Sequence, residues 1–221
     1  MPNKTNREYR NMKIETRDIE PGEEEKKIVT GYASTFEEPY KLFEFDGVEL
    51  WEVVDRGAFD KTDMSDVIMQ YDHEGRVFAR TRNNTLNVTV DDHGLKIEAD
   101  LGGTEIGREL FEEIRGGYTD RMSFGFTVNG ESEDREKLEN GVVKYTRRIT
   151  SVDKLYDVSA VSLPANDGTE IGADATARSI RNLSDGVIEK ERAERLEAER
   201  LETERRRAIV RAKALSGGTT K

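Results

Sequence analysis

The sequence predicts a mainly β fold with helices (β+α), followed by a long charged C-terminal helix. Short β-prone runs recur along residues 28–163, and turn-forming residues separate them. From about Asp185 the chain consists of helix-forming residues, with opposite charges three or four positions apart. Many short strands joined by turns are typical of a barrel or a sandwich, so we expect one of these two architectures ahead of the helix.

The predicted strands follow the β-prone runs. They cover residues 28–36, 67–71, 77–81, 85–90, 95–101, 122–128, 142–149 and 155–163. Asp91-Asp92-His93-Gly94 separates two alternating runs, which predicts a tight hairpin with His93 at its tip and a positive φ at Gly94. Residues 130–140 are rich in charge and predict an exposed loop or a hairpin tip.

One amphipathic helix interrupts the strands. Thr104 is a favoured N-terminal cap, and Gly116-Gly117 is a favoured stop. Between them Ile106, Leu110 and Ile114 recur every four residues and therefore share one face. The later charged helix has no comparable stripe, because its apolar residues keep no regular heptad and give a coiled coil only weak support.

Composition and charge divide the chain into three predicted parts. Residues 1–26 are polar, and the turn signal within them predicts a flexible N-terminal arm. Residues 27–184 contain the predicted strands and form the expected folded domain. Residues 185–221 form a charged helical tail with 10 basic and 8 acidic residues, whereas residues 1–184 carry 25 and 38. The body is therefore acidic and the tail mixed.

This composition excludes several kinds of site. An acidic body lacks the basic face that nucleic-acid binding needs, so we expect no nucleic-acid partner. The chain contains no cysteine and 2 histidines, which excludes thiolate zinc sites, a cysteine nucleophile and a three-histidine metal centre. We expect neither a metal nor a cofactor. No apolar run approaches the length of a membrane span, and residues 1–10 lack the apolar core of a signal peptide, so we expect no membrane partner.

Three side chains are candidates for hydrolytic chemistry. Ser123 lies in the apolar run Arg121-Met122-Ser123-Phe124-Gly125-Phe126, His73 follows an apolar run, and Asp157 alternates with apolar residues. Amide hydrolysis by serine requires an imidazole base and a group that fixes the tautomer of this base. A carboxylate within a buried strand requires a partner. The residues alone leave two interpretations open for each of the three, a catalytic role and a structural one.

An ordered set of short motifs extends across the same region. The motifs are Gly31-Tyr32-Ala33 with Phe36, Gly57-Ala58-Phe59, the turn at His73, Arg80-Thr81 with Leu86, Gly94-Leu95, Ile114-Arg115-Gly116-Gly117, Met122-Ser123-Phe124-Gly125-Phe126 and Asp157-Val158-Ser159-Ala160-Val161-Ser162-Leu163-Pro164-Ala165-Asn166. Each motif is common by itself, but the ordered set is specific. Over roughly residues 30–166 the chain resembles the prohead (capsid maturation) protease family of tailed bacteriophages, whose fold is similar to that of the herpesvirus assembly proteases.

The resemblance implies a closed β-barrel of the herpesvirus-protease type and a catalytic triad. By position, it implies Ser123 as the nucleophile, His73 as the general base and Asp157 as the group that orients His73. The family more often has glutamate at the third position, so the shorter Asp157 requires a closer strand, or His73 requires another partner such as Asp72. Backbone N–H groups after Ser123 and the side chain of Arg121 are the candidate oxyanion donors.

The function that the resemblance implies is that of a serine endopeptidase of phage capsid assembly. Such an enzyme would cleave scaffold or capsid-protein segments, and itself, inside the assembling prohead in the host cytoplasm. The implied partners are the major capsid protein and the scaffold, with self-association as a further option. The tail, residues 185–221, would dock to scaffold helices or be removed by self-cleavage, unless it is a solvated helix without a partner.

Two other classes of function are open from the sequence. One is a non-enzymatic scaffold or capsid-assembly factor in which the β domain is a vestigial protease. The other is an unrelated acidic binding domain. The first is disfavoured because a domain without activity has no need to retain Ser123, His73 and an acid together.

Overall fold

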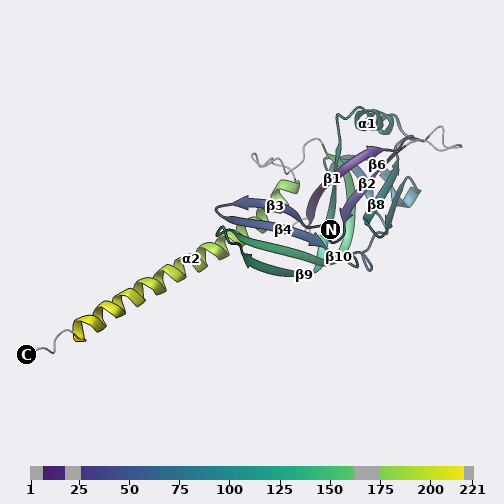
Figure 1. Cartoon of the computed structure of the whole chain (residues 1–221). Coiled ribbons are helices and arrows are strands. Elements are labelled where there is room, and N and C mark those ends of the chain that lie inside the picture. Colours follow the sequence, from purple (N-terminus) through teal and green to yellow (C-terminus); the bar gives the residue numbers. More distant parts are fainter. Residues whose placement is uncertain (1–6, 18–25, 162–174, 217–221) are drawn as a thin grey trace, which may run out of the picture. The chain divides into compact units, whose positions relative to one another are not determined.

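A sheet of ten strands dominates the part of the chain that the computed structural model describes, namely residues 7–17, 26–161 and 175–216 (Figure 1). The strands are β1 (Glu8–Thr16), β2 (Ile28–Thr35), β3 (Tyr40–Phe45), β4 (Val48–Val54), β5 (Ile68–Tyr71), β6 (Glu74–Arg80), β7 (Leu86–Val90), β8 (Gly94–Asp100), β9 (Arg121–Lys137) and β10 (Val143–Val161). The helices are a short 3₁₀ helix (Thr81–Asn83), α1 (Glu105–Arg115) and α2 (Ala175–Ser216). The mainly β class with helices is confirmed.

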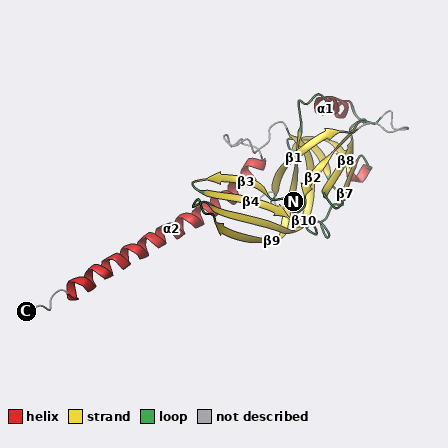
Figure 2. Cartoon of the chain, viewed as in Figure 1, coloured by secondary structure: helices red, strands yellow, loops and turns green. Residues whose placement is uncertain are grey.

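The long strand β10 pairs with three other strands, β4, β5 and β9, and so lies at the branch point of the sheet. Figure 2 draws the strands in yellow. The strand order is β3-β4-β10-β9-β1-β2-β8-β7, and β5 and β6 branch from β10. Val143 to Ile149 of β10 pair in parallel with β4, whereas Asp157 to Ala160 pair in parallel with β5. On its other edge β10 pairs with β9, antiparallel, from Val143 to Val161.

The sheet is not a closed barrel, so this part of the prediction is wrong. Closure requires a ladder between the ends of the sheet, and among the described strands none joins β7 to β6 or to β3. After β6 the chain turns through the 3₁₀ helix, and Thr85 then forms hydrogen bonds with Arg80. The N–H of Thr85 donates to the carbonyl of Arg80 (3.2 Å), and its Oγ1 accepts from the N–H of Arg80 (2.8 Å). These bonds close a turn and leave the sheet open.

Order in the sheet begins before Lys27, contrary to the prediction of a flexible arm over residues 1–26. β1 lies between β9 and β2, with Glu8 to Lys13 paired to β9 and Ile14 to Thr16 paired to β2. The sequence gives no strand signal for β1, because its charged side chains are typical of exposed positions and their ion-pair partners lie far along the chain. Residues 1–6 and 18–25 of the predicted arm lie outside the described residues.

Two predicted turns differ from the structure in detail. Gly130 to Lys137, expected in a loop, extend β9 as a largely exposed strand, and residues 138–142 form the hairpin tip. The hairpin between β7 and β8 is confirmed, with His93 exposed in its turn. However, Gly94 has no positive φ. Glycine is required there because a Cβ would overlap the carbonyl oxygen of Ser34.

The predicted helix and its boundaries are confirmed as α1. The Thr104 hydroxyl accepts a hydrogen bond from the N–H of Gly107 at 3.1 Å and caps the N-terminus. At the other end Gly117 has a φ of +74°, and the N–H groups of Gly117 and Tyr118 donate to Ile114 and Glu113. This pair of bonds is a Schellman motif. α1 packs against β1, β2 and β6, and its end leads directly into β9.

The predicted long charged helix is confirmed as α2, which begins at Ala175 and therefore earlier than expected. The contacts of the chain divide it into two units, Met1–Asn182 and Leu183–Lys221, and most of α2 belongs to the second. Of the predicted ion pairs along the helix, Arg206 with Glu202 (2.6 Å) and Arg200 with Glu197 (3.6 Å) are present. Within the described part of the chain, every helix is too short or too polar to cross a membrane.

Candidate active site

The C-terminal half of β10 and the first half of β9 carry the polar side chains of the candidate site. In the antiparallel ladder Ser159 lies opposite Ser123, and Asp157 lies opposite Gly125. Tyr9 of β1 lies opposite Gly125 on the other edge of β9. Since residues directly opposite each other project from the same face of a sheet, all five share one face.

The opposite face of the same strands is apolar. Met122, Phe124 and Phe126 alternate with the site residues along β9 and are completely or almost completely buried. The rings of Phe124 and Phe126 stack with their centroids 4.7 Å apart. This alternation produces the sequence pattern that placed Ser123 in a strand, and it fixes Ser123 on a rigid element.

His73 reaches this face from the turn between β5 and β6. Tyr71 pairs with Glu74, so Asp72 and His73 are the two central residues of the hairpin, with φ of +47° and +61°. Two positive φ values in a two-residue loop are typical of a type I′ turn, whose usual residues are Asn, Asp and Gly. Histidine in this conformation is uncommon, and such backbone strain is concentrated at functional sites. The N–H of Asp72 donates to the carbonyl of Ala160 (2.9 Å) and ties the turn to β10.

The structure brings His73 and Asp157 together. Nδ1 of His73 lies 2.5 Å from Oδ1 of Asp157, and the two side chains are only 7% and 4% exposed. The hydroxyl of Ser159 donates to the same carboxylate oxygen at 2.9 Å. Because a carboxylate accepts hydrogen bonds, Nδ1 is the donor in this contact, and the tautomer with its proton on Nδ1 has Nε2 as an acceptor. Among the described residues Nε2 has no hydrogen-bond partner.

The short acid at position 157 is accommodated by the backbone around it. The β9–β10 register shifts between Leu155 and Asp157, and Gly125 lies directly opposite the acid. A Cβ on Gly125 would be 2.5 Å from Oδ2 of Asp157, so the carboxylate occupies the space that a side chain would fill. Asp157, and not the neighbouring Asp72, is therefore the carboxylate hydrogen-bonded to His73 in this structure.

Ser123 lies on the same face but is completely buried, with 0% exposure. It makes no hydrogen bond to the imidazole, because Nδ1 of His73 bonds to Asp157 and Nε2 has no partner in the described part of the chain. Arg121, two residues earlier along β9, is partly exposed and lies 3.6 Å from the carboxylate of Asp120. The roles of Arg121 and of the backbone N–H groups in oxyanion binding remain predictions.

A family model described as Caudovirus prohead serine protease matches residues 12–185 of the chain. The chain belongs to this family. This prohead protease is a serine endopeptidase of phage capsid maturation, as the resemblance implied. The match includes His73, Ser123 and Asp157. No curated protein and no solved structure matches the chain.

Three residues of the candidate site in this prohead protease were not singled out from the sequence. The alternation of Asp157 and Ser159 along one strand could have identified Ser159 as a neighbour of the acid. Gly125 and Tyr9 gave no such signal, because their importance depends on the pairing of β1, β9 and β10. Tyr9 also precedes the part of the chain that matches the family.

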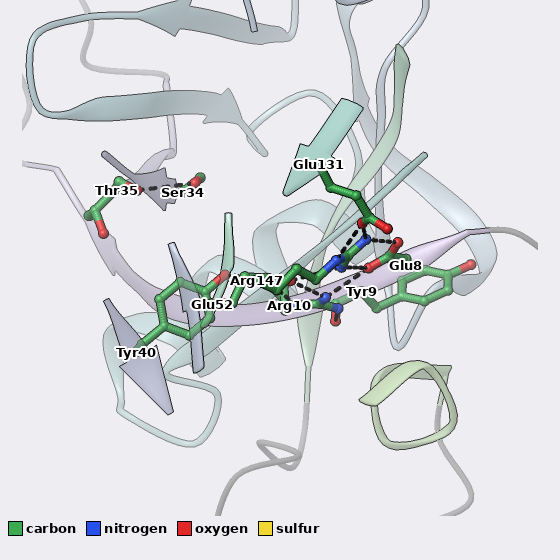
Figure 3. A network of polar contacts seen from close by, with 9 residues as sticks. All are labelled: Glu8, Tyr9, Arg10, Ser34, Thr35, Tyr40, Glu52, Glu131 and Arg147. Carbon is green, nitrogen blue, oxygen red and sulfur yellow. Dashed lines mark hydrogen bonds and ion pairs between the residues drawn. The ribbon is translucent and has the colours of Figure 1, made fainter. Parts of the chain in front are cut away.

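A buried cluster of ion pairs holds β1 of the prohead protease in the sheet (Figure 3). Arg10 is 1% exposed and binds Glu52 of β4 through two hydrogen bonds of 2.6 Å, from Nε to Oε1 and from Nη2 to Oε2. Arg147 of β10 donates to the same Glu52 (2.9 Å) and to Glu8 (2.7 Å). Tyr40 donates to Glu52 at 2.5 Å. Nε of Arg147 also donates to Glu131 of β9 at 2.6 Å, so the cluster links five strands.

The two arginines of this cluster set the ionisation of its buried carboxylate, Glu52. Burial by itself would raise the pKa of Glu52, but the charge and hydrogen bonds of Arg10 and Arg147 outweigh burial and hold this pKa below its ordinary value. Burial raises the pKa of Tyr40 well above its ordinary value, and the nearby Glu52 adds to this effect. Over the described residues the prohead protease has no group of three or more His, Asp or Glu side chains that could hold a metal ion.

Proposed function

We propose that this prohead protease cleaves scaffold or capsid-protein segments, and its own chain, inside the assembling prohead in the host cytoplasm. Ser123 is the nucleophile, His73 is the general base, and Asp157 orients His73. The observation that carries the proposal is the 2.5 Å contact between Nδ1 of His73 and Asp157, which leaves Nε2 as an acceptor on the side away from the acid. Family membership supports the same assignment.

The proposed chemistry follows from these roles. Nε2 of His73 takes the proton of the Ser123 hydroxyl as Oγ forms a bond to the substrate carbonyl carbon. The imidazolium, stabilised by the Asp157 carboxylate, then gives this proton to the amine as the C–N bond breaks. An acyl-enzyme remains on Ser123, and water hydrolyses it by the same proton transfers in reverse order.

The burial of Ser123 adds a requirement. A substrate carbonyl cannot reach a hydroxyl that is 0% exposed, so the arrangement described here is a closed one. Access of the substrate must uncover Ser123 and bring Nε2 of His73 within hydrogen-bond distance of Oγ. Catalytic hydrogen bonds often form only when the substrate is bound.

A fluorophosphonate probe tests the assignment. We expect covalent labelling of Ser123, as mapped by mass spectrometry, and loss of labelling in Ser123→Ala. In His73→Ala the labelling rate should fall by about 10³-fold or more, because nothing else removes the hydroxyl proton. Self-cleavage during expression should stop in both variants.

The second histidine supplies the control. His93 is exposed in the turn between β7 and β8, so His93→Ala should label at the wild-type rate. If His93→Ala were the more damaging substitution, the assignment of the base would be wrong. A well-folded protein that never labels and never cleaves itself would contradict the nucleophile.

A further inference from the structure

β1 presents two different faces, because successive side chains of a strand project to opposite sides. Glu8 and Arg10 project from one side, where they join the buried ion-pair cluster with Glu52 and Arg147. Tyr9, between them, projects from the other side, together with the candidate site. The ion pairs of Glu8 and Arg10, which we call the anchor of β1, and the contact of Tyr9 with the site therefore belong to consecutive residues of one strand.

The anchor fixes β1 closely. Arg10 binds Glu52 through two parallel hydrogen bonds, and its Nη1 also donates to the carbonyl of Tyr9 at 2.8 Å. A bidentate arginine–carboxylate pair has a fixed geometry, unlike a single contact of a flexible side chain. The third bond ties the backbone of Tyr9 itself to the anchored guanidinium.

Tyr9 contacts the catalytic candidate directly. The ring centroids of Tyr9 and His73 lie 4.4 Å apart at an interplanar angle of 65°, an edge-to-face arrangement. The Tyr9 ring also lies against Gly125, where a Cβ would be 2.8 Å from Cε1. The ring is thus close both to the imidazole and to the backbone of β9.

We propose that Tyr9 is a positioning residue for His73. The imidazole extends from a two-residue turn, where its only hydrogen bond among the described residues is the one to Asp157. One hydrogen bond and the covalent bond to Cβ still allow the ring to tilt through small changes of its side-chain torsions. The ring of Tyr9 removes this freedom, keeps water away from the His73–Asp157 bond and holds Nε2 in one direction.

The consequence is that the start of β1, ahead of the residues that match the family, is required for a competent base. The catalytic meaning of the inference rests on the proposed function, because it takes His73 as the base. The structural part of the inference does not, since the Tyr9–His73 contact exists whether or not the protein cleaves a peptide.

Two substitutions of Tyr9 test the proposal in the full chain. Tyr9→Ala should lower the rate of fluorophosphonate labelling at Ser123 by at least about tenfold, because a small displacement of a catalytic group is costly. Tyr9→Phe retains the ring and should label within about twofold of the wild-type rate. Thermal unfolding of each variant shows whether it is folded at the temperature of the assay.

A spectroscopic measurement separates this proposal from the proposed function. In the Ser123→Ala background, which prevents self-cleavage, the hydrogen-bonded Nδ1 proton of His73 should give a downfield NMR signal protected from exchange with water. Adding Tyr9→Ala should broaden or remove this signal, and adding Tyr9→Phe should not. Loss of Ser123 labelling with an unchanged signal would contradict positioning through the His73–Asp157 bond.

The other histidine again gives a matched control. Tyr32 contacts His93 in the same edge-to-face manner, with centroids 4.4 Å apart. Tyr32→Ala should leave both the labelling rate and the His73 signal unchanged. If Tyr9→Ala labelled as fast as the wild type, or faster, Tyr9 would not position the base, and the nucleophile assignment would still stand on Ser123→Ala.

Discussion

Gly125 lies where a side chain would meet two others at once. A Cβ there would be 2.5 Å from Oδ2 of Asp157 and 2.8 Å from the ring of Tyr9. Gly125→Ala should therefore lower labelling of Ser123 by at least about tenfold and destabilise the fold by about 1–3 kcal/mol, as overpacking does. The labelling rate and the free energy of unfolding in urea check the two parts.

Gly103→Ala is the control for that substitution. A Cβ on Gly103 would meet nothing within 4 Å, and the backbone of Gly103 has no positive φ. Its effects on labelling and on unfolding should both be small. Equal losses in the two variants would mean that the space above Gly125 has no special role.

At the level of single residues, the sequence supplied the candidates but not their geometry. Ser123, His73 and Asp157 could be named because their motifs occur in a specific order. The contact between His73 and Asp157 joins residues 84 positions apart, and it depends on the parallel pairing of β5 with β10. Local spacing carries no information about such a pairing.

Among the secondary-structure elements, β1 depends most on a single side chain. Arg10→Ala would leave the buried carboxylate of Glu52 without its bidentate partner, so we expect a loss of about 3–5 kcal/mol in the free energy of unfolding. Urea unfolding followed by circular dichroism measures this loss. Because β1 carries Tyr9, labelling of Ser123 should fall as well.

An exposed arginine of the same sheet tests whether burial is the cause. Arg148 of β10 pairs with Glu37 at 2.9 Å, but its side chain is 41% exposed. Arg148→Ala should cost less than about 1 kcal/mol, as is usual for surface ion pairs. A similar cost for both arginines would contradict the structural importance of the buried cluster.

Elements whose ends are marked by neighbouring residues were predicted. Elements that depend on residues far along the chain were not. α1 was found with its ends because Thr104 and Gly116-Gly117 act within one turn of the helix. β1 was missed because Glu8 and Arg10 are typical of exposed positions, and only Glu52 and Arg147 explain their place in a sheet. The barrel prediction was wrong for a related reason, since closure depends on whether the two ends of the sheet pair.

For the whole molecule, the end of α2 is the feature that the proposed chemistry does not use. Every described side chain from Arg192 to Lys213 is exposed, so this stretch buries no face of its own. The acidic residues of this stretch all precede residue 205, and residues 205–221 contain only basic charges. Its apolar side chains Leu196, Leu201, Ile209 and Val210 are also exposed, so the described contacts leave them without a packed partner. We propose that this stretch docks the enzyme to the scaffold of the assembling prohead.

Deletion of residues 192–221 tests this docking. Because the deleted side chains that the structure describes are exposed, we expect labelling of Ser123 to stay within about twofold of the full chain. Incorporation of the protease into proheads, measured by quantitative immunoblotting of purified particles, should fall at least about tenfold. Undiminished incorporation would identify the end of α2 as a solvated helix.

The order in which the strands of the sheet are synthesised has a consequence for timing. β1 is synthesised first, but its partner β9 begins only at Arg121. The parallel partner of both β4 and β5 is β10, which ends at Val161. A chain still on the ribosome lacks Asp157 and the strand that supports the turn of His73 until this last strand has emerged. Non-local pairing of this kind also folds slowly. With the triad proposed above, the nascent chain therefore lacks a complete catalytic site for most of its own translation.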